Sequence, residues 1–292
     1  MPLDPSQVGH ETRAQTGEVT AESIRQWADA IGDANPLFRD ETVARAAGYQ
    51  GIPVEPTYIT RFHVAFADAG LDPEHTQVLH GEQEFVYERP IVAGENVTVK
   101  YVVTNIRQSN RPGGMGILTL EQRVDGVDGQ RAAIGKATII VRDLAPGAGA
   151  SATPPGKPQQ EPSGERIPAL TKHVTQEQIN AYADVSGDHN PIHLDEATAR
   201  AVGLEGTIAH GMLSMAFLGQ TLTDWLGTQP ERGGWVKRLR VRFQAMVRPG
   251  DTLICSGALG ASEQGQQSVD VWINNQRGER VTTGDADVIF AH

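Results

Sequence analysis

The 292-residue sequence contains a single cysteine, Cys255, and lacks any long apolar run. An internal disulfide is therefore excluded, and we expect a reducing, cytoplasmic setting. No stretch approaches the roughly 20 apolar residues of a membrane span, and no basic-then-apolar leader opens the chain. Cationic residues are scarce as well: 25 Lys and Arg against 36 Asp and Glu give a net charge of −11. That balance argues against non-specific binding to nucleic acid.

What the chain does contain is an internal repeat. When the sequence is shifted against itself by 155 residues, residues 33–36 fall on 188–191 and residues 44–51 fall on 199–206. Two units are too few for a solenoid, so we interpret the repeat as the duplication of one domain. A hydrophobic content of 39% and the length allow each copy to bury its own core.

The repeat predicts two domains and a linker. Residues 146–168 are rich in Pro, Gly, Ser and Gln and have no apolar periodicity, which is typical of a surface linker. We therefore expect a first domain over residues 1–145 and a second over 169–292.

Each domain is expected to contain the same order of elements. In the second, Thr175 and Gln178 form a capping box before a short helix, and a Gly/Asp/Asn/Pro loop follows. Residues 211–226 are apolar with few charges, which predicts a buried helix. Alternating β-branched segments predict strands over residues 235–247, 252–259, 267–274 and 280–290. This order indicates an α+β fold in which an antiparallel sheet wraps around one helix.

The loop of the second domain carries the residues of greatest interest. Gly187, Asp188, Asn190, Pro191 and His193 lie within seven positions, and His210-Gly211-Met212 opens the apolar helix. The chain thus resembles the MaoC-like, or hydratase-2, family of the hot-dog fold. Its first half resembles the degenerate N-terminal repeat of double hot-dog dehydratases. The resemblance implies reversible hydration of trans-2-enoyl thioesters to (R)-3-hydroxyacyl thioesters, carried on coenzyme A or acyl carrier protein, with no cofactor.

These residue types suit that chemistry. Asp188 and His193 can exchange protons with carbon and with water, although the sequence does not assign one task to each. Asn190 has donor and acceptor atoms with which to orient the pair or the water. Unpaired N–H groups at the helix start can stabilise an enolate oxygen, and Gly211 allows a carbonyl to approach.

The first copy has lost both parts of this apparatus. Phe38 occupies the position of His193, and Pro56, which has no N–H, occupies that of Gly211. We expect a first copy that is catalytically inactive, pairs with the second and helps to form the substrate tunnel.

Other interpretations of the same residues stay open. Asp188 and Asn190 could merely close a turn, and His210 could serve only to position the helix start. Asp188, His193 and His210 could bind zinc or iron, although no paired-histidine spacing supports a metal. Arg240 lies in an alternating basic stripe with Arg238 and Arg242; this stripe is either a solvated strand face or a contact for coenzyme A phosphates or an acidic carrier protein.

Two rival functions remain. A thioesterase of the hot-dog fold would need a carboxylate on the central helix, where only Asp224 is available near the far end. A non-catalytic acyl-thioester-binding subunit would be expected to lack the motif in both copies. One chain supplies two hot-dog units, so both a monomeric pseudo-dimer and a homodimer are compatible with the sequence.

Overall fold

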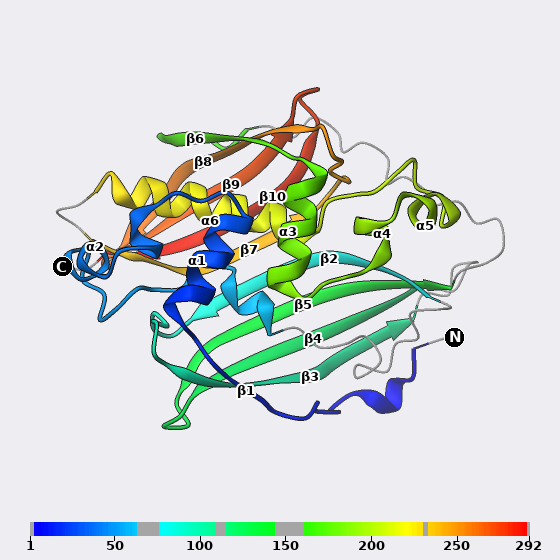
Figure 1. Cartoon of the computed structure of the whole chain (residues 1–292), viewed down its shortest axis with the longest axis horizontal. Helices are drawn as coiled ribbons and strands as arrows, with labels where there is room; N and C mark the ends of the chain where they lie inside the picture. The colour runs from blue at the N-terminus through cyan, green and yellow to red at the C-terminus, as the bar shows by residue number, and fades with distance from the viewer. Residues whose placement is uncertain (1–2, 63–75, 109–114, 144–160, 230–232, 291–292) are drawn as a thin grey trace.

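The computed structural model of the protein describes residues 3–62, 76–108, 115–143, 161–229 and 233–290. Within these ranges, ten strands form one antiparallel sheet in the order β1-β3-β4-β5-β2-β7-β10-β9-β8-β6 (Figure 1). The first repeat supplies β1 (Gln15–Glu18), β2 (Thr76–Tyr87), β3 (Asn96–Gln108), β4 (Met115–Gly126) and β5 (Arg131–Asp143). The second supplies β6 (Arg166–His173), β7 (Trp235–Phe243), β8 (Thr252–Glu263), β9 (Gln266–Asn275) and β10 (Arg280–Ile289).

The two repeats join at the centre of this sheet. Strand β2 pairs with β7 from Glu82 opposite Arg242 to Val86 opposite Arg238. On either side the order is the same, because β5 follows β2 and β10 follows β7. The repeats therefore share one sheet, and main-chain hydrogen bonds run without a break from one half to the other.

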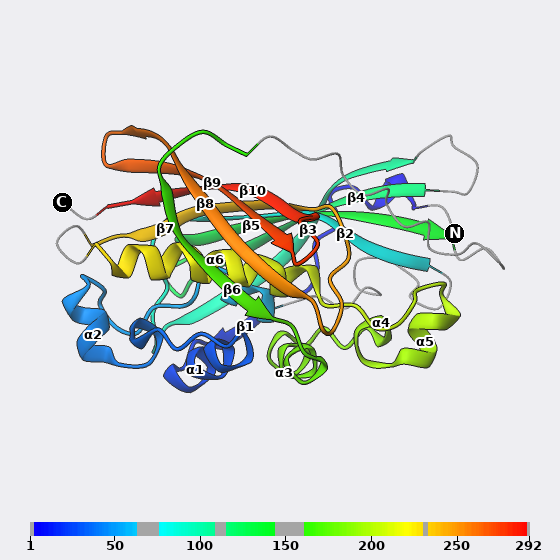
Figure 2. The same ribbon diagram turned by 90° about the horizontal axis from the view of Figure 1, so that it is seen from above.

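The α-helices lie on one side of the sheet, and α6 (Gly211–Gly227) lies between the sheet and α1 and α3 (Figure 2). Every residue of α6 from Met212 to Thr223 is buried, which explains its apolar character on all faces. The α-helices are α1 (Ala21–Ala30), α2 (Glu41–Ala46), α3 (Gln176–Ser186), α4 (Pro191–Leu194), α5 (Glu196–Ala201) and α6 (Gly211–Gly227). Three short 3₁₀ helices are η1 (Pro5–Gln7), η2 (Pro36–Phe38) and η3 (Tyr58–Arg61).

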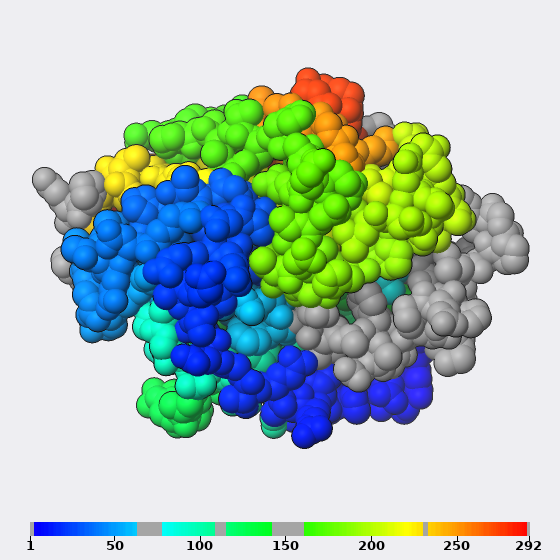
Figure 3. Space-filling view, in the orientation of Figure 1, coloured from blue at the N-terminus to red at the C-terminus, as the bar shows by residue number. Residues whose placement is uncertain are grey.

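The helices α1 and α3 are equivalent in the two repeats and abut on the helix-covered face (Figure 3). Thr20 caps α1 and Thr175 caps α3, each through its side-chain oxygen. Trp27 and Tyr182, which the repeat equates, meet edge to face with ring centroids 5.4 Å apart. Residues at equivalent positions of the two repeats are thus in contact with each other.

Most of the elements expected in the second half are confirmed. The buried helix begins at Gly211 as predicted, and four strands follow near the expected bounds. Strand β6, however, begins at Arg166, inside the segment expected to be linker; residues 146–160 of that segment lie outside the described residues. In the first half, the described part of the expected central helix is only η3, and residues 63–75 lie outside the described ranges.

Two further points concern the chain as a whole. None of the helices in the described ranges combines the length and apolar character needed to cross a membrane. Cys255, on β8, is fully buried.

Candidate active site

The loop after α3 is shaped by its own side chains. Gly187 adopts the left-handed conformation at φ 76°, which ends the helix and turns the chain back. The Asp188 carboxylate then accepts a hydrogen bond from the Asn190 N–H at 3.2 Å. Asn190 in turn caps α4 by accepting from the Ile192 N–H at 3.3 Å. Because α4 carries His193, this local network fixes the direction of the imidazole.

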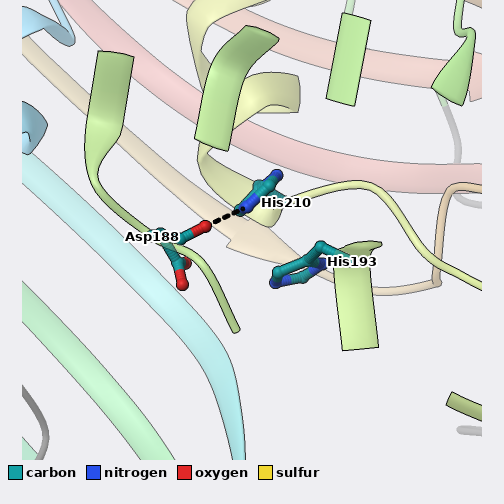
Figure 4. A group of neighbouring side chains, drawn as sticks. All are labelled: Asp188, His193 and His210. Atoms are coloured by element: carbon teal, nitrogen blue, oxygen red, sulfur yellow. Dashed lines mark hydrogen bonds between the residues drawn. The ribbon is translucent and has the colours of Figure 1, made fainter. Parts of the chain in front are cut away.

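Asp188, His193 and His210 come together in one group (Figure 4). One carboxylate oxygen of Asp188 and one ring nitrogen from each histidine lie within 4.8 Å of one another. The two imidazole rings are tilted against each other with centroids 3.8 Å apart. The sequence expectation that Asp188 and His193 lie together is thus met by the geometry, and His210 joins them. We call these three residues, with Gly211, the candidate site.

The hydrogen bond of His193 identifies its basic nitrogen. Nδ1 lies 2.8 Å from the main-chain oxygen of Ile208. A carbonyl only accepts, so Nδ1 carries the proton and Nε2 of the neutral ring keeps its lone pair. Burial lowers the pKa of His193, an effect that the Asp188 charge and the Ile208 carbonyl oppose. At neutral pH the ring is therefore neutral and able to accept a proton.

His210 holds the loop from the other side. Its Nε2 donates to the main-chain oxygen of Asp188 at 2.9 Å, which the dashed line in Figure 4 marks. Burial, and then the neighbouring His193, lower the pKa of His210 to about 4, so this ring is also neutral. It packs against Tyr182 with centroids 5.1 Å apart. His210 therefore positions Asp188 through the main chain.

Gly211 begins α6 within reach of this group. Within the described residues, the N-cap residue His210 provides no side-chain hydrogen bond to the helix, so its side chain does not cap the first turn of α6. A Cβ at Gly211 would lie 3.2 Å from the ring of Phe243. Packing against Phe243 is thus a second reason for glycine here, beside the approach of a substrate expected from the sequence; no local pattern places β7 beside α6.

The corresponding residues of the first repeat form what we call the vestigial site: Asp33, Phe38, Glu55 and Pro56. Asp33 accepts from the Asn35 N–H at 2.8 Å, and Asn35 caps η2 through the Leu37 N–H at 3.0 Å. The turn is thus the same as in the second repeat, but a buried phenyl ring ends it. The turn interpretation holds for Asp33 and Asn35, and the loop architecture does not depend on a histidine.

Glu55 adds a feature that no motif in the sequence indicated. It stands where the second repeat has His210 and is completely buried. Its Oε2 accepts from the Thr57 N–H at 2.7 Å and from Trp27 Nε1 at 3.0 Å. Burial raises the pKa of Glu55 to about 8. The Glu55 carboxyl group thus accepts from an N–H of the kind that His210, at the equivalent position, does not cap in the described part of the second repeat.

Arg240 is not brought to the candidate site. Its guanidinium lies 2.7 Å from Glu82, and Glu82 also pairs with Arg242 at 3.0 Å. Along β7, Arg240 points to the face opposite Phe243. Within the described residues, the basic stripe therefore pairs with carboxylates across the joint between β2 and β7.

The candidate site also contains groups that bind metals. A carboxylate and two imidazoles suit zinc. However, His210 Nε2 donates to a carbonyl, and a protonated nitrogen cannot bind a metal. A metal would need His210 to turn or to bind through Nδ1.

Each half of the chain matches a known protein family model. Residues 157–280 match the MaoC like domain, and residues 6–134 match the FAS1-like, dehydratase domain region. A UPF0336 protein of Saccharopolyspora erythraea is 35% identical over 153 residues, which are 50% of this chain and 95% of that protein.

Solved structures agree on the fold. A MaoC-like dehydratase superposes with a TM-score of 0.81 at 24% identity, covering 98% of this chain and 99% of that one. A Mycobacterium tuberculosis protein described as having a double hotdog fold gives a TM-score of 0.71 at 14% identity, covering 97% of this chain and 96% of that one. The second half of the chain therefore belongs to the MaoC-like domain family, the first half matches a FAS1-like dehydratase region, and the chain has the α+β double hot-dog fold.

Proposed function

We propose that the protein catalyses the reversible addition of water to trans-2-enoyl thioesters, giving (R)-3-hydroxyacyl thioesters. One observation carries the proposal: Asp188 and a neutral, buried His193 lie together beside an uncapped helix start in the second repeat. The first repeat keeps the turn but has Phe38 and Pro56 in place of the groups that the reaction needs.

Hydration of an enoyl thioester requires proton transfers that His193 and Asp188 can carry out. When water adds, its oxygen bonds to C3, the C2=C3 electron pair moves toward the thioester carbonyl, and water gives up one proton. C2 then accepts a proton as the enolate collapses. His193 Nε2 and the Asp188 carboxylate together take the proton from water and deliver one to C2. In the reverse direction the same groups remove the C2 proton and protonate the departing hydroxide.

The enolate oxygen needs stabilisation while the C2 proton is absent. The Gly211 N–H lies in the first turn of α6, where the helix dipole adds positive potential. One such donor typically contributes about 2.7–4 kcal/mol in the transition state. Pro56 has no N–H, so the vestigial site lacks this donor.

The test is hydration of a short trans-2-enoyl-CoA by the wild type, His193→Ala and Asp188→Asn. We expect each variant to lose about 10²- to 10⁴-fold in kcat, because a proton-transfer group is removed. Phe38→Ala in the vestigial site is the matched control and should retain the kcat of the wild type. Full activity in His193→Ala would overturn the proposal; release of free thiol would indicate a thioesterase, and tight binding without turnover would indicate a binding subunit.

Finer points extend the same proposal. The acyl carrier is coenzyme A or acyl carrier protein, the first repeat helps to enclose the acyl chain, and the chain acts in the cytoplasm as a pseudo-dimeric monomer or a homodimer. Arg240, which lies on the face opposite Phe243, would contact the carrier rather than the reacting carbons. Hydration assays with both carriers, with wild type and Arg240→Gln, test the carrier and this contact.

A further inference from the structure

A small cavity remains in the vestigial site. It has a volume of about 30 Å³, and its walls include Phe38, Pro56, Tyr87 and Val236. Three of these residues belong to the first repeat, whereas Val236 is supplied by β7 of the second. The site of one repeat is therefore walled in part by the central strand of the other.

A shared irregularity shows which residue of β2 corresponds to Val236. Each central strand contains one bulged residue: Gly81 in β2, relative to β5, and Lys237 in β7, relative to β10. Farther along, a glycine lies opposite each strand, Gly135 opposite Phe85 and Gly284 opposite Val241. Both landmarks give the same alignment.

The alignment places His80 at the position of Val236, since each residue directly precedes its bulge. The four cavity walls thus have counterparts around the candidate site: His193 for Phe38, Gly211 for Pro56, Phe243 for Tyr87 and His80 for Val236. Three of these counterparts already belong to the candidate site or pack on it.

Direct contacts agree with this placement of His80. Its ring meets the ring of Phe243 edge to face, with centroids 5.2 Å apart, and Phe243 covers Gly211. The negative charge of Asp188 favours the protonated form of His80 and so opposes the effect of burial on its pKa. Burial lowers the pKa of His80 to about 4, so the ring is neutral at neutral pH.

One atom of His80 lacks a partner. Its Nε2 is buried and makes no hydrogen bond within the part of the chain that the structure describes. A buried polar atom without a protein partner is costly, and a ligand or water generally completes it. The equivalent position in the vestigial site is valine, where no polar group of a substrate is expected.

We propose that His80, supplied by the first repeat, is a substrate-binding residue of the active site and forms a hydrogen bond through Nε2 to the acyl thioester. This inference rests on the proposed hydratase function and adds a role for the first repeat beyond enclosing the acyl chain. The active site then consists of a proton-transfer pair from one repeat and a polar contact from the other.

The test compares His80→Val, which installs the residue of the vestigial site, with His80→Gln, which retains hydrogen-bonding atoms. Val236→Ala is the matched control, because it alters packing at the equivalent bulge. With a short trans-2-enoyl-CoA, His80→Val should lower kcat/KM by about 10- to 100-fold, and His80→Gln should recover much of this loss. Val236→Ala should leave kcat/KM unchanged, and thermal melts check that each variant is folded.

A second readout does not require turnover. Titration calorimetry with a saturated acyl-CoA should show weaker binding to His80→Val, by about tenfold, and unchanged binding to Val236→Ala. Unchanged kcat/KM and binding in a folded His80→Val, with His193→Ala inactive, would overturn the role of His80 alone. A fully active His193→Ala would instead overturn the hydratase proposal.

Discussion

At the scale of single residues, the first repeat has Glu55 where the second has His210, and this difference has an electrostatic consequence. Glu55 is fully buried, and one carboxyl oxygen, Oε1, makes no hydrogen bond in the described part of the chain. Desolvation outweighs the hydrogen bonds from Thr57 and Trp27, so its pKa rises from 4.5 to about 8. Its counterpart His210 is neutral because its pKa falls to about 4. Both repeats thus place an uncharged group at neutral pH beside the start of the central segment.

This gives a prediction for stability against pH. The folded protein holds the Glu55 proton up to about pH 8, whereas the unfolded chain releases it near pH 4.5. The folded state therefore binds more protons between these values, and the contribution of Glu55 to stability falls as the pH rises from 4.5 to 8. Glu55→Gln cannot titrate, so its stability relative to the wild type should increase over this range.

Urea unfolding at intervals between pH 5 and pH 8.5 measures the effect. Glu22→Gln, which removes an exposed carboxylate on α1, serves as the control and should follow the wild type. A constant difference in unfolding free energy between Glu55→Gln and the wild type over this range would contradict the assignment.

At the scale of elements, two asparagines perform the same task with different consequences. Asn190 caps α4 and Asn35 caps η2, each by accepting from the N–H two residues later. Of these two helices, only α4 carries a histidine of the candidate site, His193. The same local structure thus holds a candidate-site histidine in the second repeat and Phe38 in the first.

Removal of the two caps should separate stability from activity. Asn190→Ala and Asn35→Ala should each lower the unfolding free energy by about 1 kcal/mol. Asn190→Ala should also lower kcat/KM by about 10- to 100-fold, because small displacements of a proton-transfer group are costly. Asn35→Ala should leave kcat/KM unaltered. Denaturant unfolding and steady-state kinetics on both variants check this, and equal activities would show that the cap does not position His193.

Individual helices and loops of the second repeat could be predicted from the sequence more readily than contacts between distant segments. The start of α6 at Gly211 follows from a pattern within a few residues and is confirmed; of the capping box expected at Thr175 and Gln178, the structure shows the hydrogen bond from the Gln178 N–H to the Thr175 side chain. The loop that joins Asp188 and His193 is also local. In contrast, Phe243 reaches Gly211, and His80 reaches Phe243, only through pairing between distant strands. No spacing in the sequence reports such contacts.

At the scale of the whole molecule, the joint between β2 and β7 turns two repeats into one sheet. Main-chain pairing is reinforced by ion pairs across the joint, including Arg238 with Glu84 at 2.5 Å and Arg240 with Glu82 at 2.7 Å. Such partly exposed pairs each contribute only about 0–1 kcal/mol. The shared strand edge and the common core around α6 therefore dominate the association of the halves.

The pairing of β2 with β7 leads to a prediction for fragments that contain one repeat each. Residues 161–292 alone would lose the β2 partner of β7 and expose the edge of that strand, so we do not expect this fragment to keep its fold or show hydratase activity. Residues 1–160 should likewise be inactive. When mixed, the two fragments should associate through β2 and β7 and recover activity, as followed by size-exclusion chromatography and a hydration assay. An active second fragment by itself would show that the first repeat is dispensable.

The burial of Cys255 has a practical consequence. Desolvation raises the pKa of this thiol to about 12, so almost none of it is thiolate at the pH of ordinary enzyme assays. Because it is the only cysteine, the folded protein should be nearly silent toward colorimetric thiol reagents. Coenzyme A set free by thioester hydrolysis can then be counted directly, and a hydratase can be distinguished from a thioesterase in a single cuvette.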